Sequence, residues 1–184
     1  MHSGVRALGV AESYGPDATE STLAGVVCRA DRVVDGCSFG RCTVGGTDVT
    51  DAVASLYQDL EREDVRYCLV SGIALAWYNL LEPERLAERI DRPVIAVTYE
   101  ESDGLEDALG SAFEGDELAD RLERYRRLPE RHATTVDGHD LFFRTGGIDR
   151  MEAATVLGQF TVEGGRPEPL RVARLVARAG AARR

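Results

Sequence analysis

Two short apolar segments, residues 65–70 and residues 93–98, constrain the fold of this chain more than any other feature. Each is a nearly continuous apolar run, which is typical of a strand buried on both faces of a sheet. Between them, residues 74–90 carry a helical pattern in which Pro83 would either kink or split the helix. A strand, a helix and a second buried strand form a right-handed crossover between parallel neighbours. The sequence therefore predicts an α/β fold.

The segments that precede this unit predict an antiparallel meander followed by a helix. Residues 5–11 form a short apolar strand, and residues 12–20 are polar and contain glycine and proline, which indicates a loop. Residues 21–30 and 33–44 predict two more strands joined by a tight turn, and three strands with short connections favour antiparallel pairing. Apolar residues then recur at helical spacing over residues 49–60.

The segments that follow the second buried strand predict four helices and a hairpin. The expected helices are residues 105–113, 118–128, 151–160 and 166–180, and the expected hairpin is residues 133–144. The hairpin is indicated by two strand-like runs on either side of an Asp-Gly turn. Because the chain has no internal repeat, low-complexity tract or linker, we interpret residues 1–184 as a single domain.

Charge is the strongest feature of the composition. The chain has 32 acidic residues against 22 basic ones, a net charge of −10, and it contains no lysine. Such a chain is a poor general nucleic-acid-binding surface, because phosphate contacts rely on clustered positive charge. An acidic, lysine-free composition fits a protein adapted to concentrated salt, which screens repulsion between carboxylates. The codon bias of a GC-rich genome would also favour arginine over lysine.

The sequence indicates neither a membrane span nor a zinc site. Its longest apolar stretch is interrupted by polar residues, and its amino terminus lacks the regions of a signal peptide, so we expect a cytoplasmic protein. The four cysteines form no C-x-x-C pair and lie in strand-like segments, so they are expected to be small buried hydrophobic side chains. They are Cys28, Cys37, Cys42 and Cys68.

The order of these elements is that of the RNase H-like fold, and several stretches add a local likeness. These are ALGVAES (residues 7–13), CTVGGTDVTDAV (42–53), LVSGIALAWYNLLE (69–82), RPVIAVT (92–98) and GGRPEPLRVARL (164–175). Together they resemble the archaeal endonuclease dU family, a relative of endonuclease V. The resemblance implies a mixed sheet of three antiparallel strands followed by two parallel strands. Helices would cover both faces, with a small C-terminal hairpin-plus-helix addition.

The same resemblance implies a nuclease that acts on deaminated bases in DNA, with Mg²⁺ held by acidic side chains at strand ends. Carboxylates suit this role because magnesium prefers hard oxygen ligands. One acid is expected after Gly-Val in the first strand, one near the start of the first helix, and one at the end of the fourth strand. This chain has Ala11 at the first position, Asp48 or Asp51 at the second, and Ser71 at the third, where the family reads D-G-I.

Two of the three expected positions are therefore neutral, and we expect Ala11 and Ser71 to lie side by side on neighbouring strands. Neighbouring side chains on a strand point to opposite faces, so Glu12 could replace an acid at position 11 only if the strand has already ended there. A working enzyme would use Glu12, Asp48 and Ser71, with Glu12 and Asp48 as metal ligands and Glu100 or Asp51 in support. Otherwise Mg²⁺ binds weakly or not at all, and the chain is a lapsed nucleic-acid-binding or protein-binding module.

Four further residues are candidates for nucleic-acid contact. Trp77 could stack on a flipped base, or pack a helix onto the sheet. Asn79 could line a pocket, or lie on an exposed helix face. Glu168 could complement a helix dipole, and Arg171 could meet a phosphate or a carboxylate of the site. The arginines that follow could form a nucleic-acid-binding strip, with DNA as the partner, or a solvated face. They are Arg174, Arg178, Arg183 and Arg184.

Overall fold

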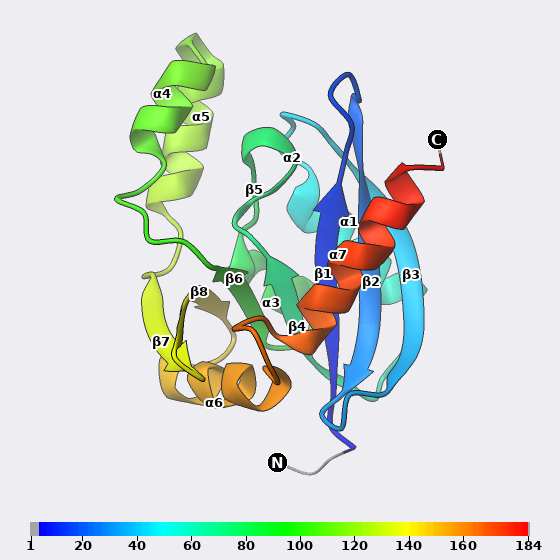
Figure 1. Ribbon diagram of the computed structural model, residues 1–184. Coiled ribbons are helices and arrows are strands. Elements are labelled where there is room, and N and C mark those ends of the chain that lie inside the picture. The colour runs from blue at the N-terminus through cyan, green and yellow to red at the C-terminus, as the bar shows by residue number, and fades with distance from the viewer. Residues whose placement is uncertain (1–3, 184) are drawn as a thin grey trace.

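A seven-stranded mixed sheet organises the computed structural model, which describes residues 4–183 (Figure 1). The strands are β1 (Arg6–Ser13), β2 (Glu20–Arg29), β3 (Val34–Thr43), β4 (Val65–Ser71), β6 (Val94–Thr98), β7 (His132–Val136) and β8 (His139–Gly146). Their order in the sheet is β3-β2-β1-β4-β6-β8-β7. β1, β4 and β6 are parallel, whereas β2, β3, β8 and β7 extend the two sides by antiparallel pairing. The predicted mixed α/β sheet is confirmed.

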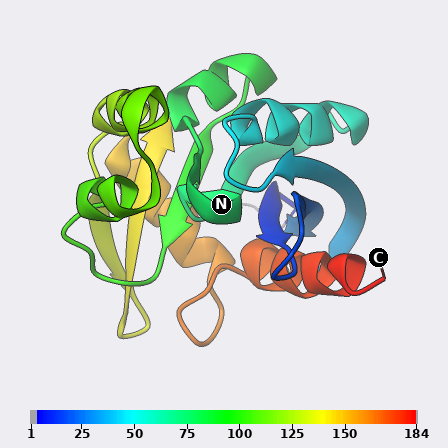
Figure 2. The same ribbon diagram turned by 90° about the horizontal axis from the view of Figure 1, so that it is seen from above.

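Helices cover both faces of this sheet. They are α1 (Val49–Asp59), α2 (Leu75–Tyr78), α3 (Pro83–Ile90), α4 (Glu106–Ala112), α5 (Gly115–Arg126), α6 (Arg150–Phe160) and α7 (Glu168–Ala181). Viewed along the strands, α1 and α3 lie on one side of the sheet, and α6 and α7 lie on the other (Figure 2). α4 and α5 pack against each other at one end of the molecule (Figure 1). None of the helices in residues 4–183 combines the length and apolarity that a membrane crossing needs.

Strand alternation divides the core into two layers. Leu8, Val10 and Val70 face α1 and α3, whereas Ala7 and Leu69 face α6 and α7. The layer under α7 is tight at Gly9, where an added Cβ would lie 2.3 Å from the backbone of Pro169. Glycine at this position therefore lets the last helix rest directly on the first strand.

The first strand is longer than the sequence predicted. Residues 12–20 were expected to form a loop, but β1 continues to Ser13, which pairs with Thr22 of β2. The cause is the partner strand, whose pairing register carries β1 past Ala11 despite the polar character of Glu12. Glu12 is consequently a strand residue, and its side chain points away from the face that Ala11 occupies.

The helical pattern over residues 74–90 is split at Pro83, one of the two expected outcomes, but its first half is a short irregular helix followed by a two-residue strand, β5 (Asn79–Leu80). α2 is not a regular helix, because Ala76, Trp77 and Tyr78 all have left-handed backbone angles, with φ of 42°, 58° and 61°. The amide of Gly45 donates to the carbonyl of Ala76 at 2.7 Å and ties this turn to the end of β3. Pro83 then starts α3 as its first residue, a position that proline favours.

One expectation about the cysteines was also wrong. Cys28, Cys42 and Cys68 are buried as predicted, but Cys37 is exposed. It lies on β3, which forms an edge of the sheet, where exposed and partly buried residues alternate.

Candidate functional site

The carboxyl ends of β1 and β4 lie next to each other, as the sequence predicted. Val10 pairs with Val70 in parallel register, so Ala11 and Ser71 follow side by side. Both side chains point toward the α7 face: Ala11 packs with Val26 and Ala173 and is 2% exposed. Ser71 follows Leu69 by two residues and so shares its face of the sheet.

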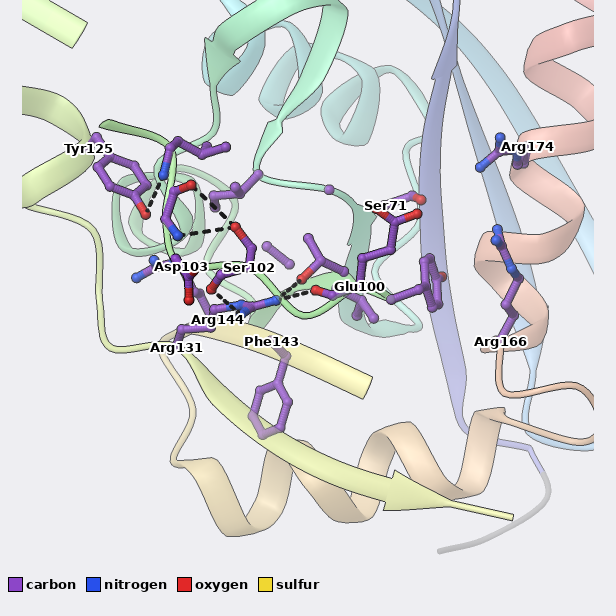
Figure 3. Close-up of a pocket in the computed structure, with 18 residues that line it drawn as sticks. Ser71, Glu100, Ser102, Asp103, Tyr125, Arg131, Phe143, Arg144, Arg166 and Arg174 are labelled. Carbon is purple, nitrogen blue, oxygen red and sulfur yellow. Dashed lines mark hydrogen bonds between the residues drawn. The ribbon is translucent and has the colours of Figure 1, made fainter. Parts of the chain in front are cut away.

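Ser71 opens into a cavity of about 650 Å³ at the ends of β4 and β6 (Figure 3). Its wall combines the end of β4 and the turn after it, β6 and the loop after it, one residue of α5, the residue before β7, part of β8, and one residue each from the segment before α7 and the middle of α7. The charged residues in the wall are Glu100, Asp103, Arg131, Arg144, Arg166 and Arg174, and the aromatic ones are Tyr99, Tyr125 and Phe143. Figure 3 shows Arg166 and Arg174 on the α7 side, and Arg131 and Arg144 at the other end.

Three of the four arginines of this cavity, Arg131, Arg144 and Arg166, contact neutral groups. Arg131 donates to the carbonyl oxygens of Glu100 and Ser102 and lies 4.2 Å from the ring centroid of Phe142. Arg166 lies 4.3 Å from the ring centroid of Tyr99. None of the four forms a salt bridge with a carboxylate of residues 4–183, although many arginines elsewhere do.

Burial alters the acidity of two of these wall residues. Burial lowers the pKa of Arg144, and the charge of Arg131 lowers it further, while Tyr125 offsets part of this effect. Burial raises the pKa of Tyr99, and the charge of Arg166 and a hydrogen bond with Ser71 oppose that rise. The site is therefore partly dehydrated, and its four arginines outnumber its two carboxylates, Glu100 and Asp103, without forming salt bridges to them, which favours an anion.

Asp48 lies on the other side of the sheet, at the start of α1. Its carboxylate accepts hydrogen bonds from the Thr43 amide at 3.1 and 3.2 Å, the Thr43 hydroxyl at 2.8 Å and the Asn79 Nδ2 at 2.7 Å. Burial raises the pKa of Asp48, but the hydrogen bonds from Asn79 and Thr43 outweigh it and leave the pKa below its usual value. These four contacts occupy the lone pairs that a metal would need.

Glu12 lies on the same side as Asp48 and accepts a hydrogen bond from the hydroxyl of the buried Ser21. Both carboxylates are close to Cys42, whose pKa rises to about 12 through burial and then through the charges of Asp48 and Glu12. The structure therefore brings Glu12 and Asp48 to one face and leaves Ser71 on the other. Within residues 4–183, no three potential ligands are grouped in a way that could hold a metal. The residues present do not fit the Mg²⁺ site that the resemblance implies.

The candidates for nucleic-acid contact are also separated. Asn79 is fully buried rather than on an exposed helix face: it donates to Thr43 and Asp48 and accepts from the Val49 amide at 3.0 Å. Trp77 is 48% exposed, and its ring centroid lies 5.0 Å from that of Phe113. Trp77 therefore packs against Phe113, the residue that follows α4, and keeps part of its ring accessible.

Glu168 and Arg171 form a bidentate pair at 2.7 Å in the first turn of α7. Cys28 pairs with Ala7 near the amino end of β1. Burial raises the pKa of Cys28, the charge of Glu168 raises it further, and the charge of Arg171 lowers it, so the pair lies near this end of the strand. They lie away from Ser71, and they are not part of the cavity wall. Sequence reasoning missed Arg166 as a wall residue. The signal was its place just before Pro167, where the chain approaches the sheet. Of the basic strip, Arg174 lines the cavity, and Arg184 is outside the described residues.

Comparison with known proteins identifies the family. A family model described as Endonuclease dU matches residues 3–180. The chain belongs to the endonuclease dU family. A relative of this family from Pyrobaculum calidifontis, named a UPF0215 protein, is 35% identical over 173 residues, which span 92% of this chain and 93% of the relative.

Solved structures extend the comparison. A protein of unknown function from Archaeoglobus fulgidus superposes with a TM-score of 0.82 at 25% identity, over 95% of this chain and 96% of that protein. Endonuclease V of Ciona intestinalis, solved with DNA containing an inosine followed by a ribo-adenosine, gives a TM-score of 0.63 at 13% identity, over 97% and 86% of the two chains. The second likeness is one of fold. This endonuclease dU family member therefore has the RNase H-like fold that the sequence predicted.

Proposed function

We propose that this endonuclease dU family member binds nucleic acid at the arginine-lined cavity and has lost most or all magnesium-dependent cleavage. One observation carries the proposal: the two strand ends that should bear acids are adjacent on one face and carry Ala11 and Ser71. The nearest substitute, Glu12, is turned to the opposite face by one step along the strand. DNA as the ligand is supported by the nature of the family and by the positive wall of the cavity.

Charge counting explains why cleavage should be weak. Breaking a phosphodiester builds negative charge on the phosphate and on the leaving oxygen, and a fixed cation is a common way to stabilise it. Carboxylates must converge from two strand ends to hold such a cation. Ser71 is neutral, and the lone pairs of Asp48 are already occupied. The four arginines can still bind phosphate oxygens, so binding can persist where catalysis has been lost.

A double substitution tests this proposal. The unmodified chain should cleave uracil- or inosine-containing DNA poorly or not at all with Mg²⁺ or Mn²⁺. Ala11→Asp combined with Ser71→Asp places two carboxylates side by side on one face, and should raise Mn²⁺ affinity by at least about tenfold. Cleavage regained by this variant would show that the rest of the site is intact. Mn²⁺ binding measured by calorimetry supplies a readout that is independent of activity.

The matched control is Ala11→Asn with Ser71→Asn, which has the same shape without the charge. It also controls for the stability lost by placing a polar group at the buried position 11. The control should bind Mn²⁺ no better than the unmodified chain. Efficient Mg²⁺-dependent cleavage by the unmodified chain that is abolished by Glu12→Gln would overturn the proposal, because Glu12 would then be the working ligand.

A further inference from the structure

Replacement of acids by neutral residues changes the charge of the site as well as its metal affinity. The wall contains four arginines and two carboxylates, Glu100 and Asp103, so arginine charge exceeds carboxylate charge by two. This excess stands out in a chain whose net charge is −10. Two of these guanidinium groups, Arg166 and Arg174, lie together on the α7 side of the wall (Figure 3), and two positive charges match a phosphomonoester, about −1.5 to −2 at pH 7, better than the single charge of a backbone phosphodiester.

Donors for a phosphate gather at the Ser71 end of the cavity. Ser71 and Tyr99 both line this end of the wall, and Arg166 lies over the ring of Tyr99. Arg174 adds a second guanidinium from α7 on the same side (Figure 3). Guanidinium and hydroxyl groups are the usual protein partners of phosphate oxygens, and stacking on Tyr99 fixes the orientation of one of them.

The cavity is larger than a phosphate ion requires. Its volume of about 650 Å³ lies within the range of small-molecule sites. Beyond Ser71 and Tyr99, the wall continues to Leu105 and Tyr125, with Arg144 near by, and this part mixes apolar and aromatic surface. A ligand with a phosphate at one end and an organic ring at the other fits this division of the wall.

We propose that this cavity binds a phosphomonoester without a metal ion, with the phosphate on Ser71, Arg166 and Arg174 and the attached organic group toward Tyr125. The ligand is either a free nucleotide or the phosphorylated end of a nucleic-acid strand. The inference rests on the proposed function in one respect, since both use the same cavity.

Calorimetry in the presence of EDTA tests the proposal. The probes are inorganic phosphate, deoxyuridine monophosphate, deoxyuridine, and a short single-stranded oligonucleotide with or without a 5′-phosphate. The monophosphate should bind, and deoxyuridine should bind at least about tenfold more weakly because it lacks the charge-assisted hydrogen bonds. A preference for the phosphorylated oligonucleotide identifies a strand end as the ligand, whereas tight monophosphate binding without that preference identifies a free nucleotide.

Variants locate the phosphate. Arg166→Gln and Arg174→Gln should each weaken monophosphate binding about tenfold or more, and Ser71→Asp should weaken it further by placing a negative charge beside the phosphate. Arg178→Gln is the matched control, because Arg178 is exposed on the same helix and is not part of the cavity wall. Its affinity should equal that of the unmodified chain. Circular dichroism checks that each variant is folded.

Three results would overturn the inference. They are no binding of deoxyuridine monophosphate in EDTA, monophosphate binding that requires added Mg²⁺, and unchanged affinity for the monophosphate in the Arg166→Gln and Arg174→Gln variants. Failure of this inference is distinct from failure of the proposed function. Binding of intact DNA with no preference for a phosphomonoester would overturn only the inference. Metal-free phosphomonoester binding by a chain with no affinity for DNA would support the inference and overturn the proposed function.

Discussion

Asp48 joins three segments of the chain through one carboxylate. It lies before α1, accepts from the backbone and side chain of Thr43 at the end of β3, and accepts from Asn79 of β5. Asn79 completes the junction by bonding the carbonyl of Thr43 and the amide of Val49. An Asp at this position is thus a junction residue rather than an available ligand or a simple helix cap, because its side chain makes no cap hydrogen bond to α1.

The charge of Asp48 should contribute to stability in a pH-dependent way. Its pKa is lower in the folded chain than in the unfolded one, so its contribution is present above the ordinary pKa of an aspartate and is lost as the pH falls through the lower folded value. Asp48→Asn should lower the free energy of unfolding by about 2 kcal/mol at pH 6, since the new amide presents N–H groups to existing donors.

Urea unfolding of both chains between pH 6 and pH 3 checks this expectation. The difference in free energy of unfolding between the unmodified chain and the Asp48→Asn variant should narrow as the pH falls. Asp17→Asn serves as the control, because Asp17 is an exposed loop residue. A difference that stays constant from pH 6 to pH 3 would show that the stability lost on Asp48→Asn comes from the altered hydrogen-bonding groups and not from the lost charge.

Individual residues show which features of the site could be predicted from the sequence. The neutral residues at positions 11 and 71 were evident from the sequence, and their adjacency followed from the strand order. The face on which Glu12 lies could not be predicted, because it depends on whether β2 keeps pairing beyond Ala11. Arg131 and Arg144 come from segments distant in sequence from Ser71, and only the folded sheet brings them to the same cavity.

At the scale of elements, the turn formed by α2 departs most from the expected structure. Leu75, Ala76 and Leu80 are buried, and their spacing imitates a helix that continues to residue 90. The observed turn is instead stabilised by tertiary contacts, which cannot be predicted from the helix propensity of the local sequence. Trp77 packs on Phe113 of the segment after α4, and the buried Arg121 of α5 donates to the carbonyl of Gly45. The other helices and strands, formed by strongly periodic segments, lie close to their predicted places.

Gly45 should be essential to this turn. Its φ of +69° is in the left-handed region, and an added Cβ would lie 2.8 Å from the Trp77 ring. Gly45→Ala should therefore cost about 2 kcal/mol, through backbone strain and displacement of the ring. For a chain of this length the melting temperature should fall by about 4–8 °C.

The fluorescence of Trp77, the only tryptophan in the sequence, reports the displacement directly and should shift on Gly45→Ala. Gly15→Ala provides the control, because an added Cβ there meets nothing within 4 Å. That variant should leave both the emission and the melting temperature nearly unchanged. An emission spectrum unaffected by Gly45→Ala would contradict the contact between the glycine and the ring.

At the scale of the whole molecule, charge is organised in two ways. On the surface, arginines are paired with acids: Arg6 bridges Asp35 and Asp64, and Arg62 contacts the same two carboxylates. The excess acids remain without such partners and repel one another, which disfavours the compact state. In the cavity, by contrast, four arginines stand with two carboxylates, and none of the four forms a salt bridge within residues 4–183.

Stability should consequently rise with ionic strength. Salt screens the repulsion between the excess acids, and it weakens the exposed ion pairs by a smaller amount because each such pair contributes little. We expect a lower melting temperature in dilute buffer than in 1–2 M KCl. Melting curves that coincide in the two buffers would contradict adaptation to salt and leave codon bias as the explanation of the arginine content.

The contact between α7 and β1 has a consequence for the order in which the chain can be completed. Pro169 and Ala173 cover the face of β1 that carries Gly9 and Ala11. On a ribosome that adds about 5–20 residues per second, β1 would emerge roughly 8–30 s before the helix that covers it. During that interval α7 cannot bury the apolar face of β1, so this face is exposed and a chaperone could bind it. The same helix brings Arg174, so the cavity gains its last guanidinium only when this late segment docks.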